Sequence, residues 1–399
     1  MEYRDVVVIG GGSTGCSILY NLAKKGVKDT LLLDMGPQLA AGQTSRSTAL
    51  IRTHYSTEVL TRMALLSYRF FKGFGRELPG RSAGYVETGL LVGADEASIE
   101  PLRRNSAMHR RLGIDSRLME PRDLASSGIE PMLDTGGFSL FAFEPNAGYA
   151  EPSTTASSFA SAAVSLGAKV LTGSRATKIE RAQSGYSVQT TEGRVRCINV
   201  VLATGVWSKP LFAGMGITLP LKGARHPVAI FGRPDGFHGT RPLVFDFPRS
   251  AYYKPEGNNL LFVGSLSHEL DSAGGDSDPD SYNQGITFDE VASYSSSAAA
   301  AYPVMATQGS YKRGYAGVYD NTPDQHPIID ELSAYGYPGI YCVVGLSGHG
   351  FKLAPEFGRI IASLIADGRF ADYDTSVFKL KRFEEGRLLE GRYGVSTIL

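Results

Sequence analysis

Glycines and one acidic residue near the N-terminus have the types and spacing needed to hold a phosphate group. Gly10-x-Gly12-x-x-Gly15 follows an apolar run, and Asp34 stands nineteen residues after Gly15. The first glycine permits a tight turn, the second lets the backbone approach a pyrophosphate, and the third allows close helix–strand packing. An acid at that distance can accept hydrogen bonds from a ribose. The motif therefore predicts a dinucleotide site that comprises Gly10, Gly12, Ser13, Thr14, Gly15 and Asp34.

Two other catalytic motifs overlap these glycines, but each lacks a part that its chemistry requires. A phosphate-binding P-loop needs a lysine where Cys16 stands, which disfavours nucleoside-triphosphate hydrolysis. Gly11-x-Ser13-x-Gly15 has the spacing of a nucleophile elbow, yet only one strand precedes Ser13 and no earlier loop could supply an oxyanion hole. A serine hydrolase is therefore a poor alternative.

A second glycine-rich turn, GLSGHGFK at 345–352, lies between a predicted strand and a predicted helix. The start of a helix carries a partial positive charge, which would favour the anionic reduced form of a flavin placed against it. This turn therefore favours FAD over NAD as the dinucleotide.

The predicted elements that position these turns are those of an α/β fold. Asp5–Ile9, Ser13–Lys25 and Thr30–Leu33 form a strand–helix–strand unit. The other strong predictions are a helix over Glu58–Phe74, strands over Val200–Leu202 and Ile340–Val344, and a helix over Pro355–Ala366 with Pro355 in its first turn.

Short strand-like segments between these elements indicate a second domain. They are Gly185–Thr191, Pro227–Phe231, Leu243–Phe245, Ala251–Lys254 and Leu260–Val263, and Asp271–Asn283 is a predicted surface loop. We expect a Rossmann-like FAD-binding domain interleaved with an α+β substrate domain on a mixed or antiparallel sheet. The predicted division gives 1–85, 146–215 and 315–399 to the first domain, and 86–145 and 216–314 to the second.

Composition excludes several classes of function. The 399 residues are 42% hydrophobic, and 40 basic residues balance 40 acidic ones, so no net charge attracts a nucleic acid. No apolar run is long enough to span a membrane, and no secretion signal is visible, which favours a cytoplasmic protein. Cys16, Cys197 and Cys342 are expected to be buried. No metal site is predicted, because no ligand-like spacing connects His54, His109, His226, His238, His268 and His326.

Motifs along nearly the whole chain resemble the FAD-dependent amine and amino-acid oxidoreductases of the D-amino-acid-oxidase superfamily, above all sarcosine oxidases, dimethylglycine dehydrogenases and related proline dehydrogenase subunits. These motifs are VVVIGGGSTG at 6–15, AGQTSRSTALIR at 41–52, NAGYAEPS at 146–153, VVLATGVWS at 200–208, YYKPEGNNLLFVG at 252–264, DNTPDQHPIID at 320–330 and GLSGHGFK at 345–352.

The resemblance implies roles for individual residues. Arg52 and Lys352 match the cations that hold a substrate carboxylate, Tyr253 matches an aromatic residue over the substrate, and His349 lies along the flavin ring as a catalytic candidate. The implied FAD contacts are Thr44, Arg46, Ser47, Thr48, Ala176, Ala203, Gly205, Gly348, His349, Gly350 and Lys352.

The implied reaction is oxidation of a C–N bond in a small amino acid or N-methylated amino acid, with hydride-equivalent transfer to flavin N5 and hydrolysis of the resulting imine. A guanidinium can grip the carboxylate bidentately and so orient the reacting C–H bond. The redox chemistry belongs to the flavin.

The sequence departs from relatives at positions that decide how FAD is attached and reoxidised. Gly317 replaces the cysteine that carries FAD in monomeric sarcosine oxidases, and Thr44-Ser45-Arg46 lacks the histidine that carries it in the dimethylglycine dehydrogenase type. Pro152 stands where heterotetrameric sarcosine oxidases have the histidine that carries FMN. The FAD is therefore expected to be non-covalent, without a second flavin.

The resemblance implies a quinone, an electron-transfer protein or oxygen as the electron acceptor. Oxygen is disfavoured, because Phe262 aligns with the lysine by which oxidases activate oxygen. Partner subunits remain open. So do two other functions: a dehydrogenase for a 2-hydroxy acid or glycerol phosphate, which uses the same scaffold, and a non-catalytic or tRNA-modifying flavoprotein subunit.

Overall fold

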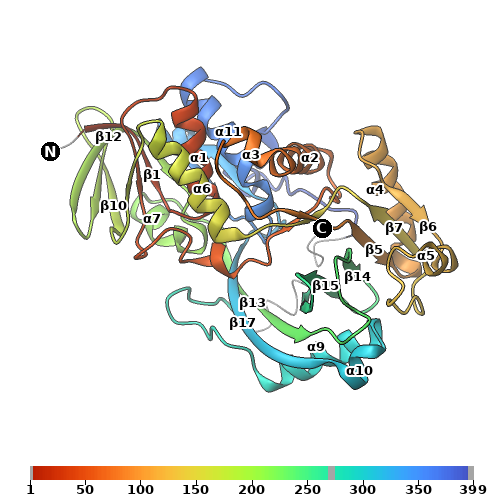
Figure 1. Ribbon diagram of the computed structural model, residues 1–399. Coiled ribbons are helices and arrows are strands. Elements are labelled where there is room, and N and C mark those ends of the chain that lie inside the picture. Colours follow the sequence, from red (N-terminus) through yellow and green to blue (C-terminus); the bar gives the residue numbers. More distant parts are fainter. Residues whose placement is uncertain (1–2, 268–274, 394–399) are drawn as a thin grey trace.

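The computed structural model describes residues 3–267 and 275–393, and its strands form two large sheets and a small one (Figure 1). His268 and residues 271–274 of the predicted loop lie outside the described residues. The long strands β13 (Lys222–Gly232) and β17 (Ser310–Asn321) extend from the second sheet toward the first. The architecture is the predicted one, a Rossmann-like α/β unit joined to an α+β unit on a mixed sheet.

Five parallel strands form the centre of the first sheet, in the order β9-β2-β1-β12-β19. Their apolar residues alternate between two cores: Val6 and Val8 face one side, whereas Val7 and Ile9 face the other. Burial on both faces explains the unbroken apolar runs in the sequence. The strands of this sheet are β1 (Tyr3–Ile9), β2 (Thr30–Leu33), β9 (Lys169–Leu171), β10 (Ala176–Arg181), β11 (Tyr186–Thr190), β12 (Gly193–Leu202), β18 (Ile328–Glu331) and β19 (Ile340–Val344).

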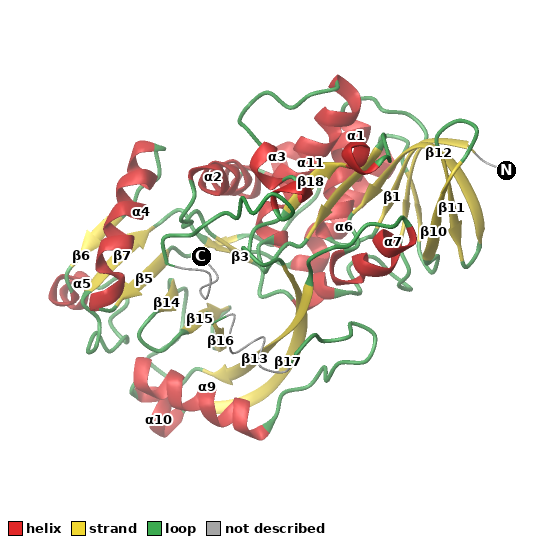
Figure 2. Ribbon diagram, turned by 180° about the vertical axis from the view of Figure 1, so that it is seen from behind, coloured by secondary structure: helices red, strands yellow, loops and turns green. Residues whose placement is uncertain are grey.

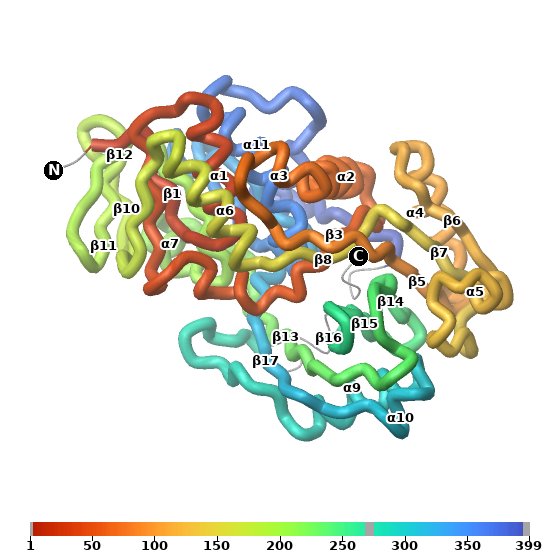
Figure 3. Tube along the Cα trace, viewed as in Figure 1, coloured from red at the N-terminus to blue at the C-terminus, as the bar shows by residue number. Residues whose placement is uncertain are grey.

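Three helices cover one face of this sheet, and α7 (Ser208–Gly214) covers part of the other (Figures 1 and 2). The three helices on the first face are α1 (Ser13–Lys24), α6 (Pro152–Ser165) and α11 (Gly350–Asp367). The first and last lie side by side although they come from opposite ends of the chain (Figure 3). A Cβ on Gly358 would lie 2.4 Å from Ser17 Oγ, so glycine is needed for this close packing.

Two predicted helices have different bounds in the structure. The helix predicted to begin at Pro355 begins at Gly350, so Pro355 lies inside α11 rather than in its first turn. This correction places Lys352 within the first turn of the helix. The helix predicted over Glu58–Phe74 ends as α2 (Glu58–Lys72), because Gly73 separates it from the short α3 (Phe74–Glu77).

The second sheet has the order β17-β13-β16-β15-β14-β5-β7-β6 and is antiparallel except between β14 and β5. One face packs against α5 (Pro121–Ser127), α9 (Phe288–Ala301) and α10 (Val304–Gln308), and α4 (Ile99–Arg111) packs on the other. The remaining strands are β5 (Leu90–Ala94), β6 (Arg117–Met119), β7 (Leu140–Glu144), β14 (Leu243–Asp246), β15 (Ala251–Glu256) and β16 (Leu260–Ser265).

A small sheet of β3 (Leu50–Ile51), β8 (Gly148–Tyr149) and β4 (Val86–Glu87) lies where the chain passes between the two units. Its first strand ends immediately before Arg52. The domain boundaries given above stay a prediction; β17 runs continuously across the boundary proposed at 315.

The three cysteines are buried, as predicted. Burial raises the pKa of the Cys197 thiol to about 12 and that of Cys16 further still, with Asp34 adding to the effect on Cys16. Over the described ranges, the helices are too short or too polar to cross a lipid bilayer.

Candidate active site

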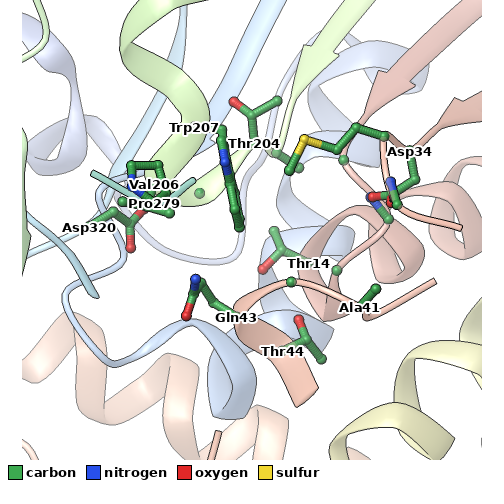
Figure 4. A pocket seen from close by; sticks show the side chains of 18 of the residues that line it. Thr14, Asp34, Ala41, Gln43, Thr44, Thr204, Val206, Trp207, Pro279 and Asp320 are labelled. Atoms are coloured by element: carbon green, nitrogen blue, oxygen red, sulfur yellow. Dashed lines mark hydrogen bonds between the residues drawn. The ribbon is translucent and has the colours of Figure 1, made fainter. Parts of the chain in front are cut away.

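A cavity of about 590 Å³ lies at the carboxyl ends of β1, β2 and β12, where ligands bind in folds of this kind. Figure 4 shows side chains from separate parts of the chain that point into it. Its walls come from residues 9–14, 33–37, 40–44 and 46–47, from the start of β10, from the residues after β12, and from parts of β13, β17 and the turn before α11.

The glycine turn forms the floor of the cavity, and its glycines are required by close backbone contacts. Gly10 has a φ of +110°, and a Cβ there would lie 2.3 Å from the Ala203 carbonyl oxygen. A Cβ on Gly15 would lie 1.8 Å from the Gly10 carbonyl oxygen. Gly15 itself does not line the cavity. It lets α1 approach the strand, and Ser13 and Thr14 at the start of this helix line the cavity instead. The N-cap residue of α1, Gly12, offers no side chain, so the helix start is open to an anion.

Asp34 faces the cavity and also supports the glycine turn (Figure 4). Its Oδ2 accepts a hydrogen bond from the Gly11 N–H at 2.6 Å, and its Oδ1 accepts one from the Gly36 N–H at 2.7 Å. Burial raises the pKa of Asp34, and the two N–H donors oppose this. The predicted ribose acceptor is therefore held rigidly at the end of β2.

Most of the predicted FAD contacts meet in this cavity. Four do not line it: Gly15, Thr48, His349 and Lys352. Those that do are Gly10, Gly12, Ser13, Thr14, Asp34, Thr44, Arg46, Ser47, Ala176, Ala203, Gly205, Gly348 and Gly350.

A segment of the second unit covers part of the cavity, and sequence reasoning missed it. The Trp207 indole N–H donates to Asp280 Oδ1 at 2.8 Å, and Arg175 forms an ion pair with the same carboxylate at 3.1 Å. Pro279 and Tyr282 also line the cavity (Figure 4 labels Trp207 and Pro279). The only sequence signal for this contact was the polar character of the predicted loop.

The residues present fit the predicted FAD. Gly10 and Gly12 let the backbone of the turn lie where Cβ atoms would collide with Ala203 and Thr44. The first turn of α1, whose Ser13 N–H donates to Thr44 Oγ1, faces the cavity with Ser13 and Thr14. Asp34 provides the acceptor for a ribose, and the cavity continues from Asp34 to the glycine turn at 345–350.

Arg52 and Lys352 do not line the cavity, but their charges act on each other and Lys352 contacts Gly348, which lines it. Their side chains come from the end of β3 and the first turn of α11, and both residues are buried, at 2% and 7% exposure. The Lys352 ammonium donates to the Gly348 carbonyl at 3.0 Å. Burial and the nearby charge of Arg52 hold the pKa of Lys352 well below its ordinary value. Two cations therefore share a buried region, as an anion-binding site requires.

Tyr253 does not join this group, which corrects the expectation for it. Its hydroxyl contacts Ser297 of α9, with Oγ at 2.6 Å, so its ring lies on the far face of the second sheet. Side chains alternate along a strand, and the neighbouring Tyr252 faces the cavity side instead. The Tyr252 hydroxyl lies 3.2 Å from His226 Nε2, and His226 lines the cavity.

His349 is buried behind the cavity wall and braces the turn before α11. Its Nε2 lies 3.1 Å from the Gln325 carbonyl oxygen, which can only accept, so Nε2 carries a proton. Its Nδ1 lies 3.2 Å from the Tyr55 hydroxyl. The structure thus shows His349 as a contact of Tyr55 rather than as a residue of the cavity surface.

A cluster that the sequence did not reveal lies next to Arg52. His54, His109 and Glu144 have their donor atoms within 4.8 Å of one another, all fully buried, although they are far apart in the chain. Each of the four histidine ring nitrogens has a hydrogen-bond partner. The three side chains therefore form a hydrogen-bonded network, although their types would also suit a metal ion.

Phe262 lies beneath another buried cation that the sequence did not indicate. The Lys254 ammonium stands 4.7 Å from the Phe262 ring and donates to the Thr48 carbonyl at 2.8 Å. It also forms an ion pair with Glu256. Burial lowers the pKa of Lys254, and Glu256 opposes this.

Comparison with known proteins gives a consistent picture. Residues 5–364 match the family described as FAD dependent oxidoreductase. Monomeric sarcosine oxidase from Bacillus sp. (strain NS-129) is 25% identical over 392 residues, 95% of this chain and 96% of that protein. Mitochondrial sarcosine dehydrogenase from Mus musculus is 25% identical over 389 residues, 95% of this chain but 41% of that protein. The chain thus spans less than half the length of the second relative.

Solved structures agree with these relatives. L-Proline dehydrogenase from P. horikoshii superposes with a TM-score of 0.87 and 26% identity, covering 97% of this chain and 100% of that one. Glycine oxidase from Geobacillus kaustophilus gives a TM-score of 0.82 over 96% of this chain and 99% of that one, and its 23% identity supports the fold alone.

Proposed function

This chain belongs to the family of FAD-dependent oxidoreductases, and on that premise we propose that it oxidises the C–N bond of a small amino acid or N-methylated amino acid. The protein is an enzyme that binds FAD, as the proteins of this family do. Sarcosine is the substrate named for two of its relatives, which supports a small N-methylated amino acid as the substrate class.

The observation that carries the proposal is the pair of buried cations, Arg52 and Lys352. An isolated buried charge is costly, and an opposite charge offsets that cost. Within the described ranges, no carboxylate lies within ion-pair distance of Lys352, whose pKa is lowered by burial and by Arg52. A substrate carboxylate beside Arg52 and Lys352 would supply Lys352 with an opposite charge, whereas Arg52 already experiences the charge of Glu144.

The residues of the chain would contribute binding and orientation. Arg52 can present two parallel N–H donors to a carboxylate, and Lys352 adds a third from the start of α11. Fixing the carboxylate restricts where the C–H bond of the substrate can lie, which accounts for much of the rate in such reactions. Bound FAD supplies the two-electron acceptor. Tyr252 and His226, rather than Tyr253, would border the substrate on the side of the second sheet.

Non-covalent attachment of FAD is part of the proposal. None of the described residues that line the cavity is a cysteine, and the single histidine among them is His226. Gly317 lines the cavity at the position where a cysteine is expected in monomeric sarcosine oxidases. Acid precipitation of the purified protein should release all flavin into the supernatant; yellow colour in the pellet would show a covalent bond.

The proposed electron acceptor is a quinone or an electron-transfer protein. Reduced flavin reacts slowly with oxygen unless a nearby positive charge stabilises superoxide, and Phe262 offers none. The charge of Lys254 above it is balanced by Glu256. In stopped-flow reoxidation, an artificial dye should react much faster than oxygen. Equal rates would identify an oxidase.

Anaerobic reduction of the yellow enzyme with a substrate panel tests the main proposal. Amino acids, N-methylated amino acids, 2-hydroxy acids and glycerol phosphate should each be mixed with the enzyme while flavin absorbance is followed. We expect bleaching by members of the first two groups. Bleaching by a 2-hydroxy acid or by glycerol phosphate alone would favour the dehydrogenase alternative, and no bleaching by any compound would favour a non-catalytic subunit.

A further inference from the structure

The segment that carries Arg52 has no regular secondary structure, yet it is buried. Residues 52–56 follow β3 and precede α2, and all five are buried. A buried irregular segment must satisfy its polar groups through side chains from elsewhere. Here those side chains come from β7 and α4 of the second unit and from the end of the described chain.

Glu144 of β7 is the centre of these contacts. Its Oε2 lies 3.1 Å from the Thr53 hydroxyl, and its Oε1 lies 2.9 Å from His54 Nδ1 and 2.7 Å from His109 Nδ1. Both carboxylate oxygens are therefore used, and two of their three partners belong to the segment that carries Arg52. Burial alone would raise the pKa of Glu144, but His109 and His54 hold it well below its ordinary value.

His109 connects Glu144 to the main chain of the segment that carries Arg52. Its Nε2 lies 2.8 Å from the Tyr55 carbonyl oxygen, which accepts only, so Nε2 carries a proton. A single proton must also lie between its Nδ1 and Glu144. That proton makes the contact between His109 and Glu144 a hydrogen bond within a fully buried pair. His54, whose pKa burial lowers, is neutral and donates from Nδ1 to Glu144.

Tyr55 connects Glu144 and His109 to the clamp, the name used here for Arg52 and Lys352, which would hold the substrate carboxylate. Its carbonyl accepts from His109, its hydroxyl lies 3.2 Å from His349 Nδ1, and its ring lies 4.1 Å from the Arg52 guanidinium. Arg52 also donates to the His54 carbonyl. His109 thus fixes the main chain of Tyr55, and Glu144 fixes the side chain of His54, the two residues that contact Arg52.

We propose that Glu144 and His109 form a buried carboxylate–imidazole pair that positions Arg52 for the substrate carboxylate. Neither residue touches the cavity, so both are positioning residues. The inference rests on the proposed function in that it takes Arg52 as one half of the carboxylate clamp. It adds two residues that fix where the guanidinium lies.

The test compares Glu144→Gln, Arg52→Met and the double variant, all as holoenzyme. Acetate is titrated at constant ionic strength, and its binding is followed by the change in flavin absorbance. We expect E144Q to weaken acetate binding about ten-fold, the effect of about one charge-assisted hydrogen bond. For the reactive amino acid, KM should rise more than kcat falls, and flavin content should stay normal.

The double variant separates positioning from an independent effect. If Glu144 acts through Arg52, R52M/E144Q should bind acetate no more weakly than R52M alone. If the two substitutions weaken acetate binding by independent factors that multiply in the double variant, the inference is overturned while the clamp stays intact. Unchanged acetate binding in R52M would overturn the clamp and the inference together.

Glu130→Gln is the matched control. Glu130 is also a buried carboxylate of the second unit, and it contacts Met132 and Arg241 rather than the clamp. Its replacement should leave acetate binding unchanged. If E130Q loses as much acetate affinity as E144Q, the effect of E144Q is general destabilisation and the proposal is overturned.

Two further measurements complete the test. If E144Q does not yield folded holoenzyme, His109→Asn is measured in the same cycle, because asparagine can reach Glu144 but not the Tyr55 carbonyl. Weaker acetate binding that is non-additive with R52M supports the pair, and unchanged binding overturns it. Elemental analysis of the wild-type protein should find no stoichiometric metal; one that is lost in E144Q would replace the pair with a metal site.

Discussion

The two ends of the site are built in different ways. At the dinucleotide end, backbone groups of the turn between β1 and α1 form the floor, and Asp34 follows β2, the next strand. At the clamp end, Arg52, Tyr55, His109, Glu144 and Lys352 come from four separate parts of the chain: the segment after β3, α4, β7 and α11. The first end depends on the absence of side chains, and the second depends on their exact partners.

This difference predicts different responses to substitution. A side chain added at the dinucleotide end meets backbone atoms that cannot move, so cofactor binding should fail altogether. A side chain removed at the clamp end takes away one interaction among several, so affinity should fall by a finite factor while the flavin stays bound.

The largest effect is expected from Gly15→Ala. The new Cβ would lie 1.8 Å from the Gly10 carbonyl oxygen, so α1 and the glycine turn cannot keep their positions. We expect purified G15A to retain essentially no FAD, measured as the flavin-to-protein absorbance ratio. Gly214→Ala is the control, because its Cβ would meet no atom within 4 Å. Normal flavin content in G15A would show that the floor is less rigid than the contacts indicate.

Removal of either clamp cation should have the next largest effect. Arg52→Met and Lys352→Met each lose a charge-assisted interaction of roughly 1.5–3 kcal/mol, or about ten- to a hundred-fold in affinity. The dissociation constant of the amino-acid substrate, from rapid anaerobic reduction, measures this loss. Flavin content should be normal in both variants. Unchanged affinity in both would contradict the clamp.

The pH dependence of carboxylate binding sharpens the comparison further. Below the lowered pKa of Lys352 both cations attract the carboxylate; as pH rises through it, the ammonium loses its proton and affinity falls. Acetate binding by the wild type should therefore weaken at a pH below the ordinary range for lysine, approaching the affinity of K352M. In K352M that step should be absent. A step that persists in K352M would belong to another group.

The smallest effect is expected where the second unit covers the dinucleotide end. Asp280→Asn weakens an exposed ion pair with Arg175 and the contact to Trp207. Exposed pairs contribute about 0.2–1 kcal/mol, so FAD dissociation should quicken by no more than about five-fold. Loss of flavin on dilution measures it, with Asp367→Asn, which breaks the exposed pair with Lys25, as the control. A loss as complete as in G15A would mean that this cover, rather than the glycine floor, holds the cofactor.

Local sequence patterns predicted the elements around the cofactor well. Strand β2 (Thr30–Leu33) and strand β19 (Ile340–Val344) have the predicted bounds, because buried parallel strands are unbroken apolar runs between glycines or acids. The start of α11 was misplaced. Pro355 suits a first turn, but the glycine turn at 345–350 begins the helix earlier, and tertiary packing tolerates proline inside it.

The clamp end was only partly predictable. Motif resemblance identifies Arg52 and Lys352 but also points to Tyr253, whose ring lies on the other face of the strand. Resemblance gives the strand, whereas the face that meets the cavity depends on how the sheet packs. His54 and His109 were each noted, but without spacing that could join them.

The sequence by itself determined the glycine turn, the acid after β2 and the cofactor class, because these depend on backbone geometry within one short unit. Only the tertiary structure decided which tyrosine faces the cavity, that two cations share a buried region, and that Glu144 lies against His54 and His109. The physical reason is that a buried charge or ring nitrogen takes its partners from whatever segments the fold brings near, and no local spacing records that choice.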